Sequence, residues 1–314
     1  GSEMCIRDRD SCHFEYPTST HAIRSYSPGD CYIRNTDEQA YTGKRSLKLT
    51  AVTSSGEESF FYKQTYYSSE DFDDSRYDPF FAPLVYPGQT VHLSVMPLPG
   101  EEMATTAQIY AKNGVTGEVI RGEKVKGDGE WHALSLEIPG GQTGHISEVG
   151  VILCGVAKGF AMGDVAAYID DLYFDGKPDY RLDFGRMKLD SWHVTHQEVP
   201  QFAKLKGHSY LDGQYLSLSC ADFAEMYTGH HLWNNYRVTA VLKPVTSTEH
   251  FVNIRVQGAM RSYAAGFSKN NKLVLRKNYY GYITLCETDF EWKVDEEYKI
   301  CLLYTSPSPR DGAT

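Results

Sequence analysis

Apolar and polar residues alternate in Ser46-Leu47-Lys48-Leu49-Thr50, and the same period of two returns in Val91-His92-Leu93-Ser94-Val95 and Val252-Asn253-Ile254-Arg255-Val256. This period places successive side chains on opposite faces of a β-strand. The chain also contains 23 Tyr and 14 Phe residues, which fit the pleated surface of a sheet. Short runs of this kind, separated by Gly, Pro and Asp, predict an all-β protein made of two β-sandwich domains.

The composition excludes several classes of partner. The 314 residues carry a formal net charge of -10, which argues against nucleic acid or an anionic membrane surface as a partner. No apolar run approaches the ~18 residues that a membrane span requires. The cysteines are scattered and contain no Cys-x-x-Cys pair, which favours reduced thiols and a cytoplasmic location over disulfides or zinc.

Both ends of the chain resemble translated sequencing adapter. A coding sequence for residues 1–9, Gly-Ser-Glu-Met-Cys-Ile-Arg-Asp-Arg, gives on reverse complementation a coding sequence for Cys-Leu-Leu-Tyr-Thr-Ser-Pro-Ser, which begins at Cys301. We therefore expect residues 1–9 and 301–314 to be non-native, and we exclude them from the fold prediction. The natural segment is then 10–300, cut at both sides.

Five motifs follow one another in the first part of this segment. They are Phe14-Glu15-Tyr16-Pro17, Tyr41-Thr42-Gly43-Lys44-Arg45-Ser46-Leu47-Lys48-Leu49, Tyr86-Pro87-Gly88-Gln89-Thr90-Val91, Gly129-Glu130-Trp131-His132 and Tyr168-Ile169-Asp170-Asp171-Leu172-Tyr173-Phe174. In this order they resemble the jelly-roll modules of the carbohydrate-binding type that accompany many glycoside hydrolases. The resemblance implies a jelly-roll sandwich over residues 10–177.

Two adjacent carboxylates, Asp170 and Asp171, interrupt an otherwise apolar strand. They point to opposite faces, so one of them turns inward or lies at a sheet edge, and a buried carboxylate needs a partner. In the resembled family a structural calcium ion commonly joins an early Glu to an Asp near the last strand. The resemblance assigns this Ca2+ to Glu15 and Asp171, with Asp170 second and with carbonyls from the loop around Gly43. The alternative is a hydrogen-bonded carboxylate that pins the N-terminal strand.

The stretch from Phe60 to Tyr67 carries aromatic residues on both faces of a predicted strand. One face can be buried while the other offers rings, Tyr62 and Tyr66 among them, that stack against a sugar or an adenine. Core packing of all these rings is the alternative.

Residues 178–300 show a second series of strands, from Tyr180-Arg181-Leu182-Asp183-Phe184 to Trp292-Lys293-Val294-Asp295-Glu296-Glu297-Tyr298-Lys299-Ile300. The series resembles the concanavalin/laminin-G type of sandwich. In that family further hairpins follow the strand that begins at Tyr298. We therefore expect a C-terminally truncated sandwich with unpaired strand edges.

A ligand surface is predicted in this second domain. If Val252, Ile254 and Val256 form the buried face of their strand, the alternating polar residues line the other face. Neighbouring polar residues would complete a cationic surface suited to sugar hydroxyls or to a phosphate. An ordinary solvent-facing sheet is the alternative. The predicted ligand residues are Asn253, Arg255, Gln257, Arg261, Tyr263 and Lys277.

Three stretches support a narrower resemblance, namely Phe14-Glu15-Tyr16-Pro17, Cys31-Tyr32-Ile33-Arg34-Asn35-Thr36-Asp37 and Val256-Gln257-Gly258-Ala259-Met260-Arg261. They resemble the C-terminal half of large bacterial proteins classed as ADP-ribosylglycohydrolases. This implies a non-catalytic accessory region that recognises a glycan or an ADP-ribose-like molecule, with an upstream catalytic domain in the parent chain. No catalytic residue can be carried over, because the family's acidic magnesium motifs are not present in this sequence.

Two other functions remain open from the sequence. Concanavalin-like folds also host glycoside hydrolases, which need two carboxylates beside the scissile bond. A structural spacer that mediates oligomerisation is the third hypothesis, since fold alone does not decide function.

Overall fold

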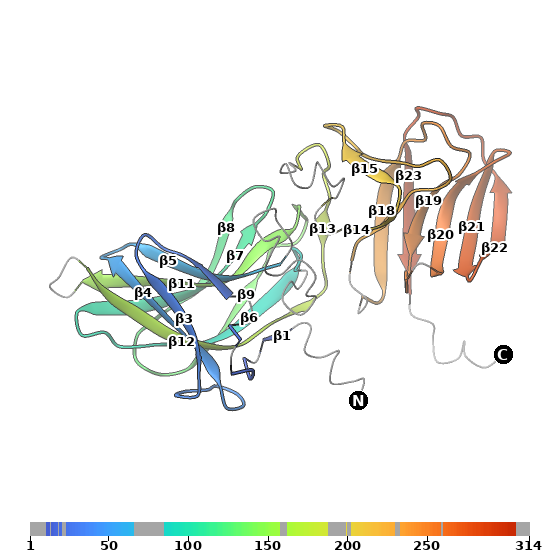
Figure 1. The fold of residues 1–314 in the computed structure, drawn as a ribbon. Helices are drawn as coiled ribbons and strands as arrows, with labels where there is room; N and C mark the ends of the chain where they lie inside the picture. The colour runs from blue at the N-terminus through green and yellow to red at the C-terminus, as the bar shows by residue number, and fades with distance from the viewer. Residues whose placement is uncertain are drawn as a thin grey trace. The chain divides into compact units, whose positions relative to one another are not determined.

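The computed structural model describes residues 11–12, 14–17, 19–20, 23–65, 85–157, 162–187, 199, 202–229, 233–258 and 260–305. Their regular secondary structure consists of β-strands, which confirms the all-β prediction (Figure 1). The chain forms two compact units. The first comprises Gly1–Phe202 and Gly207–Ala224, and the second Ala203–Lys206 and Glu225–Thr314.

The first unit is a sandwich of two antiparallel sheets. Sheet 1 has the strand order β3-β4-β12-β6-β9, with β1 paired to β12, and sheet 2 has the order β2-β5-β11-β7-β8. The strands are β1 (Ser11–Cys12), β2 (Ile23–Tyr26), β3 (Cys31–Thr36), β4 (Ser46–Ser54), β5 (Glu58–Gln64), β6 (Gln89–Pro97), β7 (Met103–Asn113), β8 (Val119–Lys126), β9 (His132–Glu137), β11 (Ile146–Ala157) and β12 (Met162–Gly176).

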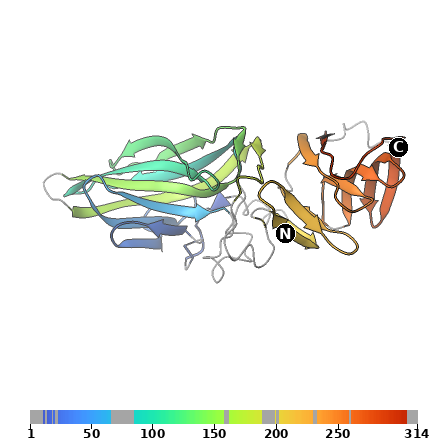
Figure 2. The ribbon, with the colours of Figure 1, turned by 90° about the horizontal axis from the view of Figure 1, so that it is seen from above.

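The core of this unit lies between the two sheets, which Figure 2 shows as two layers. Alternate residues of each strand point inward, among them Leu47 and Leu49 of β4 and Ile109 of β7, all fully buried. This is the packing that the period of two predicts. The odd-numbered residues of β5, β7 and β11 point into the core, so the even-numbered residues form the outer face of sheet 2.

The boundary between the units lies later than the division after residue 177 that the sequence suggested. Strand β13 (Tyr180–Arg181) pairs with β10 (Gln142–Thr143), and the ring of Tyr180 stacks on Tyr86 at a centroid distance of 4.4 Å. Residues just after 177 therefore pack with the first unit. The hairpin of β15 (His208–Leu211) and β16 (Leu216–Ser219) also belongs to it.

The second unit contains one four-stranded sheet and two strand pairs. Its strands are β14 (Ala203–Lys206), β17 (Glu225–Tyr227), β18 (Tyr236–Leu242), β19 (His250–Ile254), β20 (Arg261–Ser268), β21 (Lys272–Tyr279), β22 (Tyr282–Asp289) and β23 (Tyr298–Tyr304). The four-stranded sheet runs β19-β20-β21-β22, while β14 pairs with β17 and β18 with β23. Strand β23 continues past residue 300 to Tyr304 and keeps its pairing with β18.

A small aromatic cluster forms the core of the second unit. Phe267 is 1% exposed and packs against Phe290, Trp292 and Tyr298, with ring centroids 4.8–5.9 Å apart. In contrast, all eight residues of β22 are exposed. Strand β22 is therefore an exposed edge of this sheet. The concanavalin/laminin-G type of this unit stays a prediction.

Within the part of the chain that the structure describes, no helix is long and apolar enough to span a membrane.

Candidate functional site

The outer face of sheet 2 carries a row of residues from four strands. Tyr62 of β5 lies opposite Gly150 of β11, which lies opposite Tyr110 of β7 and then Arg121 of β8. Gly150 has no side chain to fill the space between the two tyrosines. A Cβ at this position would approach the carbonyl oxygen of Phe61 to 2.0 Å, so the sheet accepts only glycine here.

An ion pair crosses this face. The two terminal nitrogens of the Arg121 guanidinium donate to the two carboxylate oxygens of Glu58, at 2.8 and 2.9 Å. The two residues lie on β8 and β5, separated by β7 and β11, and Arg121 is in the row of Tyr62, four residues along β5 from Glu58. On a flat sheet their backbones would be about 14 Å apart across the strands and about 13 Å apart along them. Side chains that rise straight from a flat sheet would not meet over that distance. The sheet is therefore curved so that these two side chains meet over it, and we call this part of the outer face the trough.

The floor of the trough is buried although it lies outside the sandwich core. Tyr110 is 0% and Ile152 2% exposed, in the middle of the outer face. Burial raises the pKa of the Tyr110 hydroxyl well above its usual value, and the nearby Glu148 carboxylate adds to this shift. The hydroxyl donates to Glu148 at 3.3 Å, and Lys112 binds the same carboxylate at 3.0 Å.

Aromatic rings line the other side of the trough. Phe60 meets the ring of Tyr110 edge-on at a centroid distance of 5.2 Å, and Tyr26 lies 6.5 Å from Phe60. Tyr26 is 70% exposed, so it extends the aromatic surface into solvent. Planar rings beside charged, hydrogen-bonding side chains suit a ligand with both apolar faces and hydroxyl groups.

Of the two tyrosines predicted on this strand, the structure places Tyr62 on the trough. Tyr66 lies outside the described residues. The sequence did not indicate Glu58, Arg121 or Tyr110, because they lie on three strands whose spatial order differs from their order in the chain. The only local signal was the alternation within each strand.

The ligand residues predicted in the second unit do not share one face. Asn253 lies opposite Ala264, whereas Ile254 lies opposite Tyr263, which in turn lies opposite Lys277. Tyr263 and Lys277 are therefore on the face of Ile254, and Asn253 is on the other face, where it donates to Glu225. The predicted grouping is wrong, because the period of two within one strand does not say which face a residue of the neighbouring strand shares, and the register places Tyr263 opposite Ile254.

Arg255 and Gln257 are not strand residues, since β19 ends at Ile254. Arg255 has a φ of 51°, a left-handed conformation that ends the strand. Its guanidinium lies over the rings of Tyr263 and Tyr304, at 5.8 and 5.3 Å. Gln257 is exposed in the turn that precedes β20, where its N–H donates to the carbonyl of Arg261.

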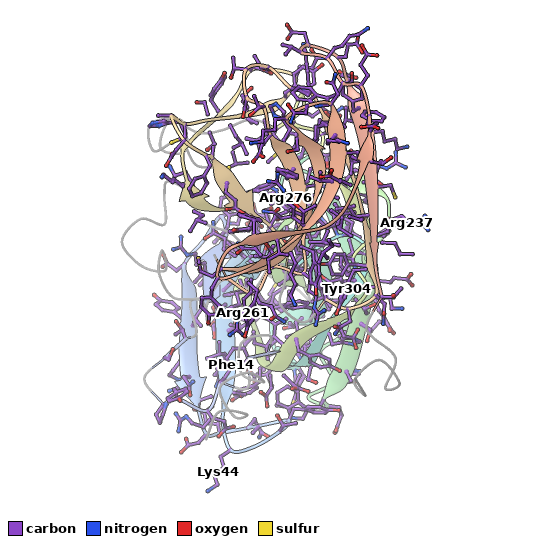
Figure 3. The ribbon with its side chains drawn as sticks, turned by 90° about the vertical axis from the view of Figure 1, so that its right-hand side faces the viewer. Phe14, Lys44, Arg237, Arg261, Arg276 and Tyr304 are labelled. Carbon is purple, nitrogen blue, oxygen red and sulfur yellow. The ribbon has the colours of Figure 1, made fainter. Side chains whose placement is uncertain are left out.

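Two carboxylates hold the loop at residues 41–45 of the first unit. Oε1 of Glu15 accepts from the N–H groups of Lys44 and Arg45, at 2.9 and 3.2 Å. Oδ2 of Asp170 accepts from the N–H groups of Tyr41 and Thr42, at 3.0 and 2.9 Å. The loop itself reaches into solvent at Lys44 (Figure 3).

Asp170, and not Asp171, is the carboxylate that faces this loop. Asp170 is fully buried, and burial raises its pKa to about 6. Asp171 has a φ of 52° and lies in a β-bulge between Asp170 and Tyr173, where its N–H donates to Oδ1 of Asp170. One of the two carboxylates thus turns inward, as the alternation predicts, but it is Asp170 and not the Asp171 that the resemblance placed first.

The donor chemistry at this loop fits a calcium ion in part. Glu15 and Asp170 supply hard oxygen donors to one loop, and a Cβ at Gly43 would come within 2.1 Å of the Glu15 carboxylate. N–H groups already bind three of the Asp170 lone pairs, so loop carbonyls would have to supply the remaining ligands. Among the described residues no cluster of three or more His, Cys, Asp or Glu side chains forms a metal site. Calcium at Glu15, Asp170 and Asp171 stays a prediction.

A serine, a histidine and an aspartate meet on the outer face of sheet 1. His92 Nδ1 lies 2.9 Å from Ser135 Oγ, and His92 Nε2 lies 3.1 Å from Asp175. This order is the reverse of that in serine hydrolases, where the aspartate binds Nδ1 and the serine binds Nε2. We assign the group a structural role, because it joins the side chains of three adjacent strands, β9, β6 and β12.

No protein-family model and no curated protein matches the chain. Similar solved structures include carbohydrate-binding modules. One, from the β-sandwich superfamily and described for promiscuous specificity, is 15% identical with a TM-score of 0.38, covering 53% of this chain and 61% of that chain. The C-terminal family 22 module of Clostridium thermocellum Xyn10B is 15% identical with a TM-score of 0.32, covering 54% and 94%. The xylan-binding family 22 domain of Paenibacillus barcinonensis Xyn10C is 19% identical with a TM-score of 0.34, covering 54% and 94%.

Proposed function

We propose that the first unit is a non-catalytic glycan-binding module and that the trough is its binding site. The observation that carries the proposal is the outer face of sheet 2, where aromatic rings lie beside the Arg121–Glu58 ion pair that crosses the face. A pyranose ring has C–H faces that pack on aromatic rings and an equatorial rim of hydroxyls that needs donors and acceptors. The trough supplies both kinds of surface.

The roles of the lining residues follow from their exposure. Tyr26, which is mostly exposed, and Phe60 and Tyr62, which are half-buried, would stack against sugar rings. Arg121 and Glu58 would bind sugar hydroxyls, since charged groups form the stronger hydrogen bonds. Gly150 lies between Tyr62 and Tyr110 and adds no side chain of its own to this surface.

Affinity gel electrophoresis of the intact chain in soluble xylan, glucomannan and hydroxyethylcellulose tests this proposal. We expect retardation by at least one polymer, and loss of roughly tenfold in affinity, about 1.4 kcal/mol, for Tyr62→Ala or Tyr26→Ala. Tyr32→Ala is the matched control, because Tyr32 is a 63% exposed tyrosine on the outer face of sheet 1.

Three outcomes would contradict the proposal. Equal retardation of Tyr62→Ala, Tyr26→Ala and Tyr32→Ala would remove the trough from the site. Turnover of chromogenic glycosides by the wild-type chain would favour the hydrolase hypothesis. Absence of binding together with a stable oligomer in light scattering would favour the spacer.

The larger context is part of the proposal. In the parent protein that we propose, this module follows the catalytic domain of a bacterial hydrolase. The class of that hydrolase is the ADP-ribosylglycohydrolases, which the sequence resembles. Sequencing the complete gene from its source genome tests this context directly.

A further inference from the structure

A continuous row of cations and tyrosines lies on one face of the four-stranded sheet in the second unit. Lys277 lies over the ring of Tyr279 at 5.4 Å, and Arg261 lies 5.4 Å from the rings of both Tyr279 and Tyr280. Arg261 also donates to the Tyr280 hydroxyl at 3.0 Å. We call this row the tyrosine–cation face. It consists of Arg255, Arg261, Tyr263, Lys277, Tyr279 and Tyr280.

The strand register explains why these side chains meet. Tyr263 lies opposite Lys277, and Arg261 lies opposite Tyr279, so both pairs project from the same side of β20 and β21. Arg255 joins them from the end of β19 through the Tyr263 ring. Arg261, labelled in Figure 3, is the first residue of β20.

The positive charges of this face are not neutralised within the described residues. Among the carboxylates that the structure describes, none lies within 4.0 Å of a charged nitrogen of Arg255, Arg261 or Lys277. The same sheet pairs its other cations: Lys272 binds Asp289 at 2.7 Å and Arg276 binds Glu249 at 2.8 Å. Arg255, Arg261 and Lys277 thus form a local group of three cations on a chain whose net charge is -10.

The tyrosine rings of this face are available to a ligand. Tyr279 is 54% and Tyr280 64% exposed. Lys277 and Arg261 both lie against the Tyr279 ring, and Arg261 against Tyr280, but more than half of each tyrosine stays exposed to a ligand. Exposed rings beside unpaired cations match a ligand that combines a sugar ring with a negative charge.

We propose that the tyrosine–cation face is a second binding site and that it takes an anionic carbohydrate. The sugar ring packs on Tyr279 and Tyr280, and a carboxylate or phosphate of the ligand binds Arg261 and Lys277. A uronic-acid chain and an ADP-ribose-like molecule share this chemistry. The site is independent of the trough, and it does not need Tyr304, which belongs to the segment that resembles adapter sequence.

Paired ligands test the charge requirement on the intact chain. Affinity electrophoresis in polygalacturonate is compared with fully methyl-esterified pectin, which lacks the carboxylate, and calorimetry with ADP-ribose is compared with adenosine. We expect binding of polygalacturonate, ADP-ribose or both, weakened by added salt, and no measurable binding of either uncharged counterpart.

Variants of matched charge locate the site. Arg261→Ala and Lys277→Ala should each weaken binding roughly tenfold, the loss expected for a charge-assisted contact. Lys272→Ala is the control, because it also removes one positive charge and Lys272 lies on the same strand as Lys277. Lys272 is already paired with Asp289, so this variant should bind the ligand like the wild type. Arg261→Lys keeps the positive charge, so it should retain most of the affinity. It thereby shows whether the loss in Arg261→Ala comes from the missing charge or from misfolding.

Retention of polygalacturonate alone would identify the anion as a carboxylate, and binding of ADP-ribose alone would identify it as a phosphate. Either result supports the proposal. Equal binding by Arg261→Ala and Lys272→Ala, or binding that ignores methyl esterification, would overturn it. Tighter binding of a single-stranded oligonucleotide than of either sugar ligand would also overturn it, since stacked tyrosines and cations can hold bases as well. Loss of trough binding in Tyr62→Ala leaves all these results unaffected, so the two proposals fail separately.

Discussion

Gly43→Ala should destabilise the first unit by more than a change of backbone conformation explains. Gly43 has a φ of 66°, and an alanine in this left-handed region costs about 1–2 kcal/mol. The lower entropy of the unfolded alanine chain offsets about 0.4–1 kcal/mol of this cost. The backbone term is therefore about 1 kcal/mol.

The second term comes from Glu15. The new Cβ would lie 2.1 Å from Oε1 of Glu15, so the carboxylate must swing away and lose its bonds to the N–H groups of Lys44 and Arg45. At about 1 kcal/mol for each hydrogen bond, this adds about 2 kcal/mol. The total loss for Gly43→Ala is then about 3 kcal/mol.

Gly56→Ala is the matched control. Gly56 has a φ of 85°, but a Cβ there meets no atom within 4 Å, so only the backbone term of about 1 kcal/mol remains. Calorimetry of the first unit's transition should separate the two variants by roughly 4–8 °C in Tm. Equal Tm values would refute the reasoning. So would a difference of the same size in a Glu15→Ala background, where no carboxylate is left to displace.

Two further predictions concern carboxylates of the first unit. If calcium joins Glu15 to Asp170, a chelator should lower the Tm of the wild type but not of Asp170→Asn. The reason is that an ion bound only to the folded state stabilises that state. An unchanged wild-type Tm would exclude calcium. Hydrogen bonds from Tyr168 and then Lys48 lower the pKa of Glu38 from 4.5 to about 2. The stabilisation by Glu38 is therefore present above pH 4.5 and lost as the pH falls toward 2, so the Tm gap between wild type and Glu38→Gln should close over that range; a constant gap would contradict the assignment.

The alternation of residues was sufficient to predict the strands and the sandwich architecture. In β4 the residues Leu47 and Leu49 are buried as their spacing predicts, and Lys48 between them points outward to Glu38. Burial of alternate residues depends only on the order of residues within one strand, so it can be predicted from the sequence.

Pairing between strands could not be predicted in the same way. The face assigned to Tyr263 and Lys277 depended on the register across the turn between β19 and β20, which is set by the turn's backbone conformation. Asp170, and not Asp171, faces the loop beside a β-bulge in β12, and strict alternation of residues does not predict a bulge. The trough residues depended on the spatial order of β5, β11, β7 and β8, and each pair of neighbours in that order is fixed by long-range packing.

The ion pair across the trough also affects how the chain responds to its medium. A sugar ring that reaches the buried Tyr110 must displace Arg121 or Glu58, so only the opened fraction of molecules is competent to bind. A partly exposed ion pair contributes up to about 1 kcal/mol, and dissolved ions weaken it. The same ions screen the attraction of the tyrosine–cation face for anions. If both proposed sites bind as inferred, ionic strength acts on them in opposite directions, and added salt shifts the balance of binding from acidic toward neutral sugars.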